Sequence, residues 1–408
     1  MKVVQINTIV NSGSTGRITE DIGTVLLANG HQSFIAFGRG NRPSKSQLIK
    51  IGSKWDIYWH GFQTIVFDRH AFASKAATQG LIKEIERLKP DVIGLHNLHG
   101  YYINIEILFN YLKTIQIPVV WTLFDCWAFT GHCTYFDDIN CTKWIKGCSE
   151  CPKKKKYPSS YFKDNSKSNY LNKKSLYADF NNLELVVHSR WLQNIVQQSF
   201  LHKVPTHHIF SGIDLDIFQP STKGSWIIEK YQLGFKKIVL GVASTWDKRK
   251  GLDDFIQLNN YLSSGQQIVL IGLNQQQLKS LPSSIIGIER TENVDELAAL
   301  YSVADVFVNP TWQDNFPTTN LEALACGTAV ITYNTGGSPE AIDEATGFVI
   351  KKGNVQSLAD AVNTVLENGK NHYRNNCRKR AEQLFNKNDR YGDYLKLYES
   401  LLTQAVKN

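Results

Sequence analysis

Short hydrophobic runs alternate with amphipathic stretches along the chain. The first run, MKVVQINTI at residues 1–9, alternates and then becomes apolar, as a buried strand does. A turn of small residues at 11–16 follows, and then a helical pattern over residues 17–28 and a second strand over residues 33–37. This order predicts a βαβ unit with two parallel strands.

The same alternation recurs in two series. In the first half we predict strands at residues 92–96, 118–123 and 183–188, and helices at 81–88, at 105–115 and from Trp191 onward. In the second half we predict strands at 237–242, 267–272, 306–308, 329–331 and 347–350, and helices at 251–262, 294–303, 320–326 and 355–367. Two such series predict an α/β protein with two doubly wound parallel sheets, joined near residues 211–214.

Length and composition agree with two globular domains. The chain has 408 residues, of which 42% are hydrophobic and 20% are charged. No apolar run approaches the roughly 20 residues that span a bilayer, and the first residues lack the apolar segment of a signal peptide. The expected location is therefore the cytoplasm.

Positive charge is concentrated in one segment. The formal net charge is +8. The clustered lysines are Lys143, Lys146, Lys153, Lys154, Lys155, Lys156, Lys163, Lys167, Lys173 and Lys174. Such a cluster attracts phosphate groups, polyanions or anionic lipid headgroups, so we expect a peripheral membrane contact. The alternative interpretation is a solvated, lysine-rich loop.

Four of the seven cysteines lie close together in the same region. Cys133, Cys141, Cys148 and Cys151 have the spacing C-x7-C-x6-C-x2-C. Four thiolates at this spacing suit a structural zinc ion, although only the last pair has the tight knuckle spacing. Reduced thiols and disulfides remain alternatives, and the expected cytoplasmic location disfavours disulfides.

One loop of the second half combines two carboxylates with a helix start. The segment TWQDNFPTTNLEA at 311–323 follows a predicted strand, where ligands of parallel α/β sheets bind. Pro317 and a threonine cap are expected to begin the helix, whose free N–H groups favour a diphosphate. Asp314 and Glu322 can bracket a ligand there, because a carboxylate accepts two hydroxyl donors.

Two further loops follow strands in the same half. The segment STWDKRKG at 244–251 directs cations toward the place expected for phosphates. The segment TGGSPE at 335–340 has paired glycines, which let backbone approach a ligand closely. Each loop alone is a weak signal, but their occurrence after strands of one domain predicts a ligand site.

These segments resemble the family 4 retaining glycosyltransferases. DNFPTTNLEALACG at 314–327 is similar to the family's Glu-x7-Glu segment, GVASTWDKRKGL at 241–252 to its phosphate-binding segment, and SGIDLDIFQP at 211–220 to its interdomain linker. HNLHGYYIN at 96–104, TGHC at 130–133 and the cysteines resemble the colanic-acid-type transferases of bacterial surface polysaccharides.

The resemblance implies the GT-B fold, with two Rossmann-like, doubly wound parallel-sheet domains facing a cleft. The first domain would comprise residues 1–213 on the acceptor side, with a cysteine- and lysine-rich insert at 126–174. The second would comprise residues 214–388 and bind the nucleotide sugar. Residues 389–408 would form a helix that crosses back to the first domain.

The resemblance also implies donor-side roles. Glu322 would hold the ribose hydroxyls, Asp314 would hold sugar hydroxyls, and Lys250 would neutralise the diphosphate leaving group. No cofactor would then be required for catalysis. The other implied donor contacts are Gly13, Gly16, Arg249, Arg290, Asn315, Phe316, Pro317, Thr318 and Thr319. Asp314 stands where glutamate is usual, and Arg249 would replace an arginine that is absent before the lysine.

The acceptor side is implied by fewer residues. His96, Asn97 and His99 follow a predicted strand and are expected there. Related enzymes often carry His-Asp where this chain has Phe124 and Asp125, so the usual histidine function is absent or moved. Asp125 remains as a candidate catalytic residue.

We therefore expect a hexosyltransferase that uses a nucleotide-sugar donor and a growing, lipid-linked oligosaccharide acceptor at the inner face of the membrane. A sugar-nucleotide epimerase of the same architecture is the first alternative. A non-enzymatic nucleotide-sugar-binding protein is the second, and nucleic acid is not an expected partner.

Overall fold

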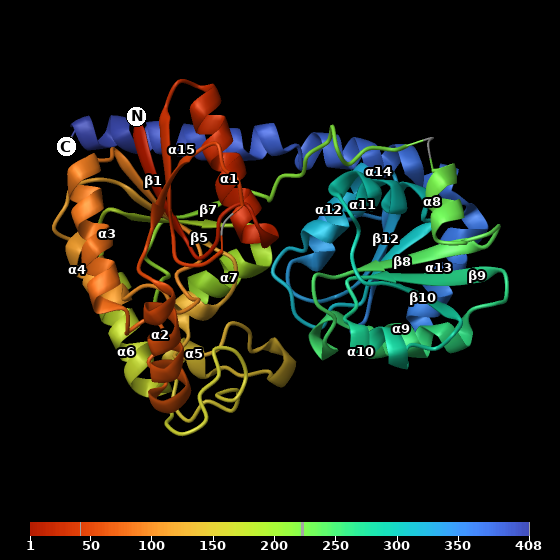
Figure 1. The fold of residues 1–408 in the computed structure, drawn as a ribbon, viewed down its shortest axis with the longest axis horizontal. Helices are drawn as coiled ribbons and strands as arrows, with labels where there is room; N and C mark the ends of the chain where they lie inside the picture. Colours follow the sequence, from red (N-terminus) through yellow and green to blue (C-terminus); the bar gives the residue numbers. More distant parts are fainter. Residues whose placement is uncertain (41, 222–223, 408) are drawn as a thin grey trace. The chain divides into compact units, whose positions relative to one another are not determined.

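A computed structural model of the chain describes residues 1–40, 42–221 and 224–407, with the side chains of 405–407 left out. The chain forms two compact units (Figure 1). Unit 1 comprises Met1–Phe210 together with the residues from Arg390 onward, and unit 2 comprises Ser211–Asp389. No helix in the described ranges is long and apolar enough to cross a membrane.

Within the described residues, unit 1 has a seven-stranded parallel sheet in the order β3-β2-β1-β4-β5-β6-β7. Its strands are β1 (Lys2–Asn7), β2 (Gln32–Phe37), β3 (Gln47–Lys50), β4 (Val92–Leu95), β5 (Val119–Leu123), β6 (Leu183–Val187) and β7 (Thr206–His208). Its helices are α1 (Gly13–Ala28), α2 (Lys54–Phe67), α3 (Lys75–Leu88), α4 (Ile105–Leu112), α5 (Lys143–Lys146), α6 (Ser166–Tyr177), α7 (Arg190–Gln198) and most of α15 (Lys387–Lys407).

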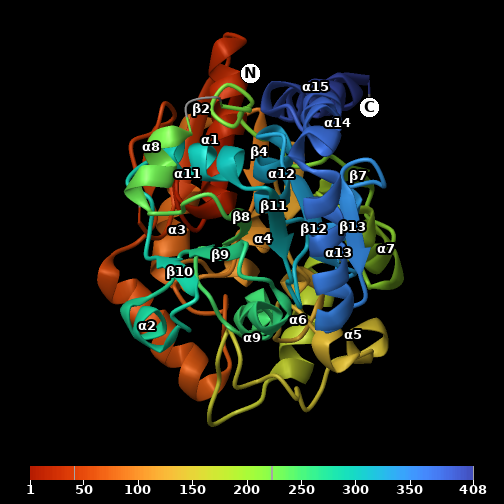
Figure 2. The same ribbon diagram turned by 90° about the vertical axis from the view of Figure 1, so that its right-hand side faces the viewer.

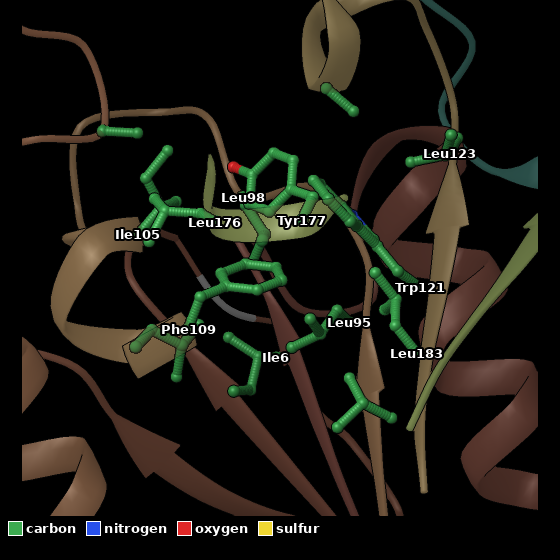
Figure 3. Packing of buried hydrophobic residues seen from close by; sticks show 14 of the residues in the cluster. Ile6, Leu95, Leu98, Ile105, Phe109, Trp121, Leu123, Leu176, Tyr177 and Leu183 are labelled. Atoms are coloured by element: carbon green, nitrogen blue, oxygen red, sulfur yellow. The ribbon is translucent and has the colours of Figure 1, made fainter. Parts of the chain in front are cut away.

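Hydrophobic side chains cover both faces of this sheet, as a parallel sheet requires. On one face, Phe109 of α4 and Trp121 of β5 pack around Tyr177 of α6, with ring centroids 4.4 and 5.0 Å from that of Tyr177 (Figure 3). On the other face, Tyr394 and Tyr398 of α15 pack in one cluster with residues of α1, β1 and β4. The C-terminal helix therefore contributes to the core of unit 1.

Unit 2 has a six-stranded parallel sheet over its described residues, in the order β10-β9-β8-β11-β12-β13. Its strands are β8 (Lys237–Val242), β9 (Gln266–Ile271), β10 (Ile285–Ile288), β11 (Val306–Asn309), β12 (Ala329–Tyr333) and β13 (Gly347–Ile350). Its helices are α8 (Ser225–Lys230), α9 (Leu252–Leu258), α10 (Gln275–Ser280), α11 (Val294–Val303), α12 (Thr318–Ala325), α13 (Val355–Asn368) and α14 (Lys370–Leu384).

Helices lie on both faces of the second sheet. Figures 1 and 2 show α8, α11, α12 and α14 over one face and α9, α10 and α13 over the other. Two doubly wound parallel sheets were predicted from the alternation of strands and helices, and the structure confirms them. The α1 helix differs in its start, because it begins at Gly13 rather than at residue 17.

Candidate active site

The loops of unit 2 that carry the predicted donor residues meet where its strand order reverses. From β8 the chain continues outward through β9 and β10, and then returns to β11 on the other side of β8. Ligands of open α/β sheets bind outside the carboxyl ends of strands at such a switch point. Backbone contacts join the two loops there, since Trp312 N–H donates to the carbonyl of Arg249 over 2.7 Å.

Lys250 and Asp314 form an ion pair between these two loops. The Lys250 ammonium donates to Oδ2 of Asp314, and both side chains are largely buried. Asp247 Oδ1 accepts the backbone N–H of Lys250 over 3.0 Å and fixes the turn that carries the lysine. Arg249 is also held, because its guanidinium donates to the carbonyl of Gln313 over 3.0 Å. The structure thus brings Lys250, Arg249 and Asp314 together.

Glu322 lies buried on α12, one helix turn beyond the loop. Its Oε2 accepts the hydroxyl of Tyr301 over 2.9 Å, which orients the carboxylate. The helix begins at Thr318, with Pro317 as the N-cap residue and no side chain capping the helix. The predicted threonine cap is therefore wrong. Helix starts without a side-chain cap leave N–H groups for an anion.

The glycine loop at 335–340 packs against the carboxylate loop through its backbone. Gly337 N–H donates to the carbonyl of Asn315 over 2.8 Å. At Gly336, φ is +56°, and a Cβ atom would lie 1.7 Å from the carbonyl oxygen of Asp314. Glycine is thus required by both the conformation and the close approach. Beside it, the buried Thr335 hydroxyl has no hydrogen-bond partner among the described residues.

The remaining donor-side predictions fall into two groups. Asn315, Thr318 and Thr319 lie at the start of α12 with Pro317, whereas the ring of Phe316 is buried 5.9 Å from that of Phe385. Arg290 is not brought to these residues. It is exposed after β10, and β9 and β8 separate that strand from β11 in the sheet.

Unit 1 has a switch point of its own, between β1 and β4. Gly13 and Gly16 lie in the first turn of α1, directly after the loop that follows β1. A Cβ atom at Gly16 would lie 3.2 Å from the backbone nitrogen of Asn11, so the chain is tightly folded there. Thr8 Oγ1 donates to the carbonyl of Asn97 over 2.9 Å and joins the β1 and β4 loops.

His99 and Asp125 pair at the carboxyl ends of β4 and β5. Nε2 of His99 lies 2.8 Å from Oδ2 of Asp125, and Nδ1 lies 2.9 Å from the hydroxyl of Tyr157. Asp125 Oδ1 also accepts the backbone N–H of Trp127 over 2.9 Å. A carboxylate that holds one ring nitrogen of a histidine orients the ring for proton transfer or charge stabilisation.

The other two acceptor-side candidates have structural partners. Nε2 of His96 lies 2.9 Å from Oε1 of Gln5, and burial lowers the pKa of His96 to about 3. His96 is therefore a neutral residue packed below the loop. Asn97 accepts the backbone N–H of His99 over 3.2 Å and so shapes the turn. Phe124 lies between His96 and His188, with ring centroids 6.2 and 5.3 Å away.

The four clustered cysteines line one small cavity. Cys133, Cys141, Cys148 and Cys151 surround a space of about 20 Å³ together with Trp144. All four are free thiols, and a hydrogen bond from Cys133 lowers the pKa of Cys151. In the described part of the chain, no three His, Cys, Asp or Glu side chains are arranged to hold a metal ion.

The lysine cluster is less uniform than the sequence suggests. Lys173 is buried in α6, where its ammonium donates to the carbonyls of Trp127 and Thr130 over 2.7 and 3.0 Å. Burial lowers the pKa of Lys173 to about 7. This lysine therefore serves the interior of the insert and is not part of a solvated surface.

Three residues of these sites were missed by sequence reasoning: Tyr301, Tyr157 and Thr335. Tyr301 orients Glu322 from 21 positions away, and Tyr157 contacts His99 from 58 positions away. Neither tyrosine belongs to a sequence motif that includes the residue it contacts. Thr335 belonged to a predicted loop, but only its burial without a partner marks it out.

Comparison with known proteins adds a family match and several relatives. The model of the glycosyl transferases group 1 family matches residues 227–384. The putative colanic acid biosynthesis glycosyl transferase WcaC of Escherichia coli (strain K12) is 26% identical over 171 residues, 39% of this chain and 41% of its own. The capsular polysaccharide biosynthesis glycosyltransferase CapM of Staphylococcus aureus is 23% identical over 234 residues, 52% of this chain and 62% of its own.

A third relative is the N,N'-diacetylbacillosaminyl-diphospho-undecaprenol alpha-1,3-N-acetylgalactosaminyltransferase of Campylobacter jejuni subsp. jejuni serotype O:2. It is 29% identical over 205 residues, which are 47% of this chain and 53% of its own. The alignments thus span between 41% and 62% of the lengths of these three relatives.

Solved structures show the same fold over almost the whole chain. Sucrose-phosphate synthase from Thermosynechococcus elongatus superimposes with a TM-score of 0.73 at 15% identity, covering 99% of both chains. Anabaena Alr3699/HepE in complex with UDP-glucose superimposes with a TM-score of 0.66 at 14% identity, covering 98% of this chain and all of its own. At these identities the likeness establishes the fold alone.

Proposed function

Residues 227–384 match the model of the glycosyl transferases group 1 family, and the chain has the GT-B fold. We therefore propose that it transfers a sugar from a nucleotide-sugar donor to an acceptor. The observation that carries this proposal is the joining of Lys250, Asp314 and the start of α12 at the switch point of unit 2. This arrangement places an ammonium, a carboxylate and helix N–H groups where a diphosphate and a sugar can bind together.

In the proposed reaction, each group acts on one part of the donor. Lys250 and the first N–H groups of α12 stabilise the negative charge that develops on the leaving diphosphate. Asp314 accepts hydroxyls of a hexose-type sugar, and Glu322, held by Tyr301, accepts the ribose hydroxyls. The positive charges that other transferases take from a divalent metal then come from the chain, so we propose a metal-independent transfer. Its retaining stereochemistry is proposed from the resemblance to the family 4 retaining glycosyltransferases.

The names of the relatives support an acceptor in bacterial surface polysaccharide biosynthesis. Two are named for colanic acid and capsular polysaccharide, and the third is named for a sugar-diphospho-undecaprenol acceptor. We propose that the acceptor is a growing, lipid-linked oligosaccharide, met at the cytoplasmic face of the membrane. These names favour transfer over the epimerase alternative.

A panel of nucleotide sugars tests the donor proposal through thermal unfolding. A ligand that binds only the folded state raises the melting temperature, so the true donor should stand out from the panel. Glu322→Gln should lose most of that rise, because it replaces an acceptor of hydroxyl groups. Glu367→Gln, an exposed position on α13, is the matched control. A panel without any stabilising member, or full stabilisation of Glu322→Gln, would contradict the proposal.

We also propose that the four cysteines of unit 1 bind a structural zinc ion. Their support is the cavity that they share, across which bound zinc would draw the thiolates together. Freshly reduced protein should contain about one equivalent of zinc by metal analysis. Cys148→Ser with Cys151→Ser should remove it, whereas Cys326→Ser in unit 2 should not. Metal-free protein after purification without chelator would refute the proposal.

A further inference from the structure

Helix α2 carries its large apolar side chains on the outside. Trp55 is 81% exposed, and the least exposed of the five, Ile65, is still 42% exposed. The set comprises Trp55, Tyr58, Trp59, Phe62 and Ile65. Their spacing places them along one side of a helix. Soluble proteins rarely expose a contiguous apolar patch of this kind without a partner for it.

The inner side of α2 is polar, which fixes this orientation. The buried residues of the helix are His60 and Thr64. Nδ1 of His60 lies 2.7 Å from Ser74 Oγ, and Nε2 accepts the backbone N–H of Ala71 over 2.9 Å. Rolling the helix to bury its aromatic side would break both hydrogen bonds and expose the histidine. The outward aromatic side is therefore built into the fold of unit 1.

A second segment extends the apolar side of α2 and adds cations. The backbone N–H of Tyr161 donates to the carbonyl of Ile65 over 2.9 Å, and that of Lys163 donates to the carbonyl of Val66 over 3.2 Å. Figures 1 and 2 show this loop beside α2. It brings the exposed rings of Tyr161 and Phe162 to the helix. The exposed lysines of this segment are Lys155, Lys156 and Lys163.

Negative charges in the same neighbourhood are engaged by backbone. Asp56 caps α2 by accepting the N–H of Ser53 over 2.8 Å. Asp164 accepts the N–H of Cys151 over 2.7 Å and that of Ser166 over 2.9 Å. The exposed lysines are therefore not paired with these two carboxylates and keep their charge for an external partner.

We infer that this aromatic–lysine face, comprising the exposed side of α2 and residues 155–163, docks onto an anionic phospholipid bilayer. Tryptophan and tyrosine prefer the boundary between headgroups and acyl chains, and lysines nearby bind acidic headgroups. A helix of 14 residues is about 21 Å long, so α2 lies in the plane of the bilayer and does not cross it. Protein interfaces, by contrast, are depleted of lysine.

A polar hollow beside the face suits a headgroup. A space of about 580 Å³ opens between the end of α2, the start of α4 and α6. Arg69 and Lys163 line it, together with Glu106 and the amides of Asn165 and Asn169. The Arg69 and Lys163 cations can hold a lipid phosphate while the aromatic rings enter the bilayer, whereas the amides of Asn165 and Asn169 shape the hollow by donating to the carbonyls of Phe67 and Asp68.

This inference deepens the proposed function, because a lipid-linked acceptor would lie in the same bilayer. Its test needs no sugar transfer, and so the two can fail separately. If the protein binds vesicles but no nucleotide sugar stabilises it, the membrane-docking inference stands and only the donor proposal is refuted. Stabilisation by a donor without vesicle binding would do the reverse.

Co-sedimentation with vesicles tests the face. Vesicles of phosphatidylcholine mixed with phosphatidylglycerol should bind the full chain, and phosphatidylcholine alone should bind it much more weakly. Trp55→Ser with Trp59→Ser should weaken binding roughly tenfold or more, because two rings that would enter the bilayer are lost. Lys155→Glu with Lys156→Glu should weaken it by about fivefold for each lysine. Phe235→Ser, a fully exposed ring in unit 2, is the matched control and should bind like the wild type.

Three results would overturn the inference. The first is unchanged vesicle binding by the tryptophan variant, whose melting temperature should equal that of the wild type because both rings are exposed. The second is equal binding to neutral and anionic vesicles. The third is a lipid-free dimer in gel filtration that the tryptophan substitutions dissociate, since the face would then join two copies of the chain.

Discussion

The Lys250–Asp314 ion pair shows how single residues of this protein depend on distant ones. The two residues are 64 positions apart, yet their charged groups meet at one loop junction. Sequence resemblance could assign each a role, and the order of strands could place both at carboxyl ends. Their direct pairing could not be predicted, because it depends on the path of two loops without regular structure.

Lys250→Met should lower turnover by roughly 10²–10³-fold, because it removes a cation from the developing charge of the leaving group. Steady-state kinetics with saturating donor measures the effect. Lys248→Met is the control, since Lys248 is exposed on the same turn and should tolerate the change. Full turnover by the Lys250 variant would remove this residue from the mechanism.

In unit 1, His99 and Asp125 likewise meet although they are far apart in the sequence. Both were singled out from the sequence, but as separate candidates, because they are 26 positions apart. The histidine that related enzymes carry beside the aspartate is Phe124 here. The structure supplies His99 from the neighbouring strand end to contact Asp125 instead.

Asp125→Asn should lower turnover, because an amide no longer orients the His99 ring as the carboxylate does. His99→Gln should have a similar effect, and the double variant should be little worse than either, since the pair acts as a unit. His202→Gln, at an exposed position, is the control. Additive losses would show that the two residues act independently.

At the scale of elements, the strands that the sequence predicts best are the buried ones. Strands β5, β11 and β12 are mostly apolar and are buried along their whole length. Strands β3 and β7 were not predicted, because they are short edge strands with exposed or half-buried residues. Helix α2 was missed for a different reason, since its apolar side faces outward and gives no core pattern.

The contact between the glycine loop and the carboxylate loop makes a prediction at this scale. Gly336→Ala should destabilise unit 2 by more than about 2 kcal/mol and weaken donor binding, because its Cβ would overlap the Asp314 carbonyl. Gly234→Ala is a matched control in the same unit, with φ of +62° and open space around the new atom. It should cost only about 1 kcal/mol. Equal effects in thermal unfolding would show that the loop contact is not needed.

At the scale of the whole molecule, the two units differ in their histidines. Of the 11 histidines, all but His372 lie in unit 1. Burial lowers the pKa of His60 and His96 to about 3 and that of His188 to about 4, and it also lowers the pKa of His70. These groups stay neutral when folded but take up protons when unfolded.

Acidification should therefore destabilise unit 1 first. A histidine whose pKa is lowered by folding contributes full stability above about pH 6.5 and loses it as pH falls toward the folded pKa. At about pH 5.5 each such residue costs about 1 kcal/mol. His132 acts in the opposite direction: burial lowers its pKa, but the Asp68 carboxylate raises it overall.

Hydrogen exchange at neutral and acidic pH, corrected for intrinsic rates, checks this expectation. Amides of β1 and β4 should lose protection on acidification well before those of β8 and β11. Restored neutral pH should restore their protection. Equal losses in both sheets, or an earlier loss in unit 2, would contradict the assignment of acid sensitivity to the buried histidines.

Helix α15 gives unit 1 a discontinuous sequence, and this affects how a nascent chain folds. Tyr391, Tyr394 and Tyr398 are buried in the same cluster as Val3 and Ile18. A ribosome therefore produces residues 1–210 and all of unit 2 before it supplies the rings that complete the first core. Unit 2 is contiguous and can fold as it emerges, whereas one face of the unit 1 sheet is covered only in part, by α1, until residues 391–398 have been made. We expect the unit that is translated first to complete its folding last. During that interval its incomplete core should need to be protected by chaperones.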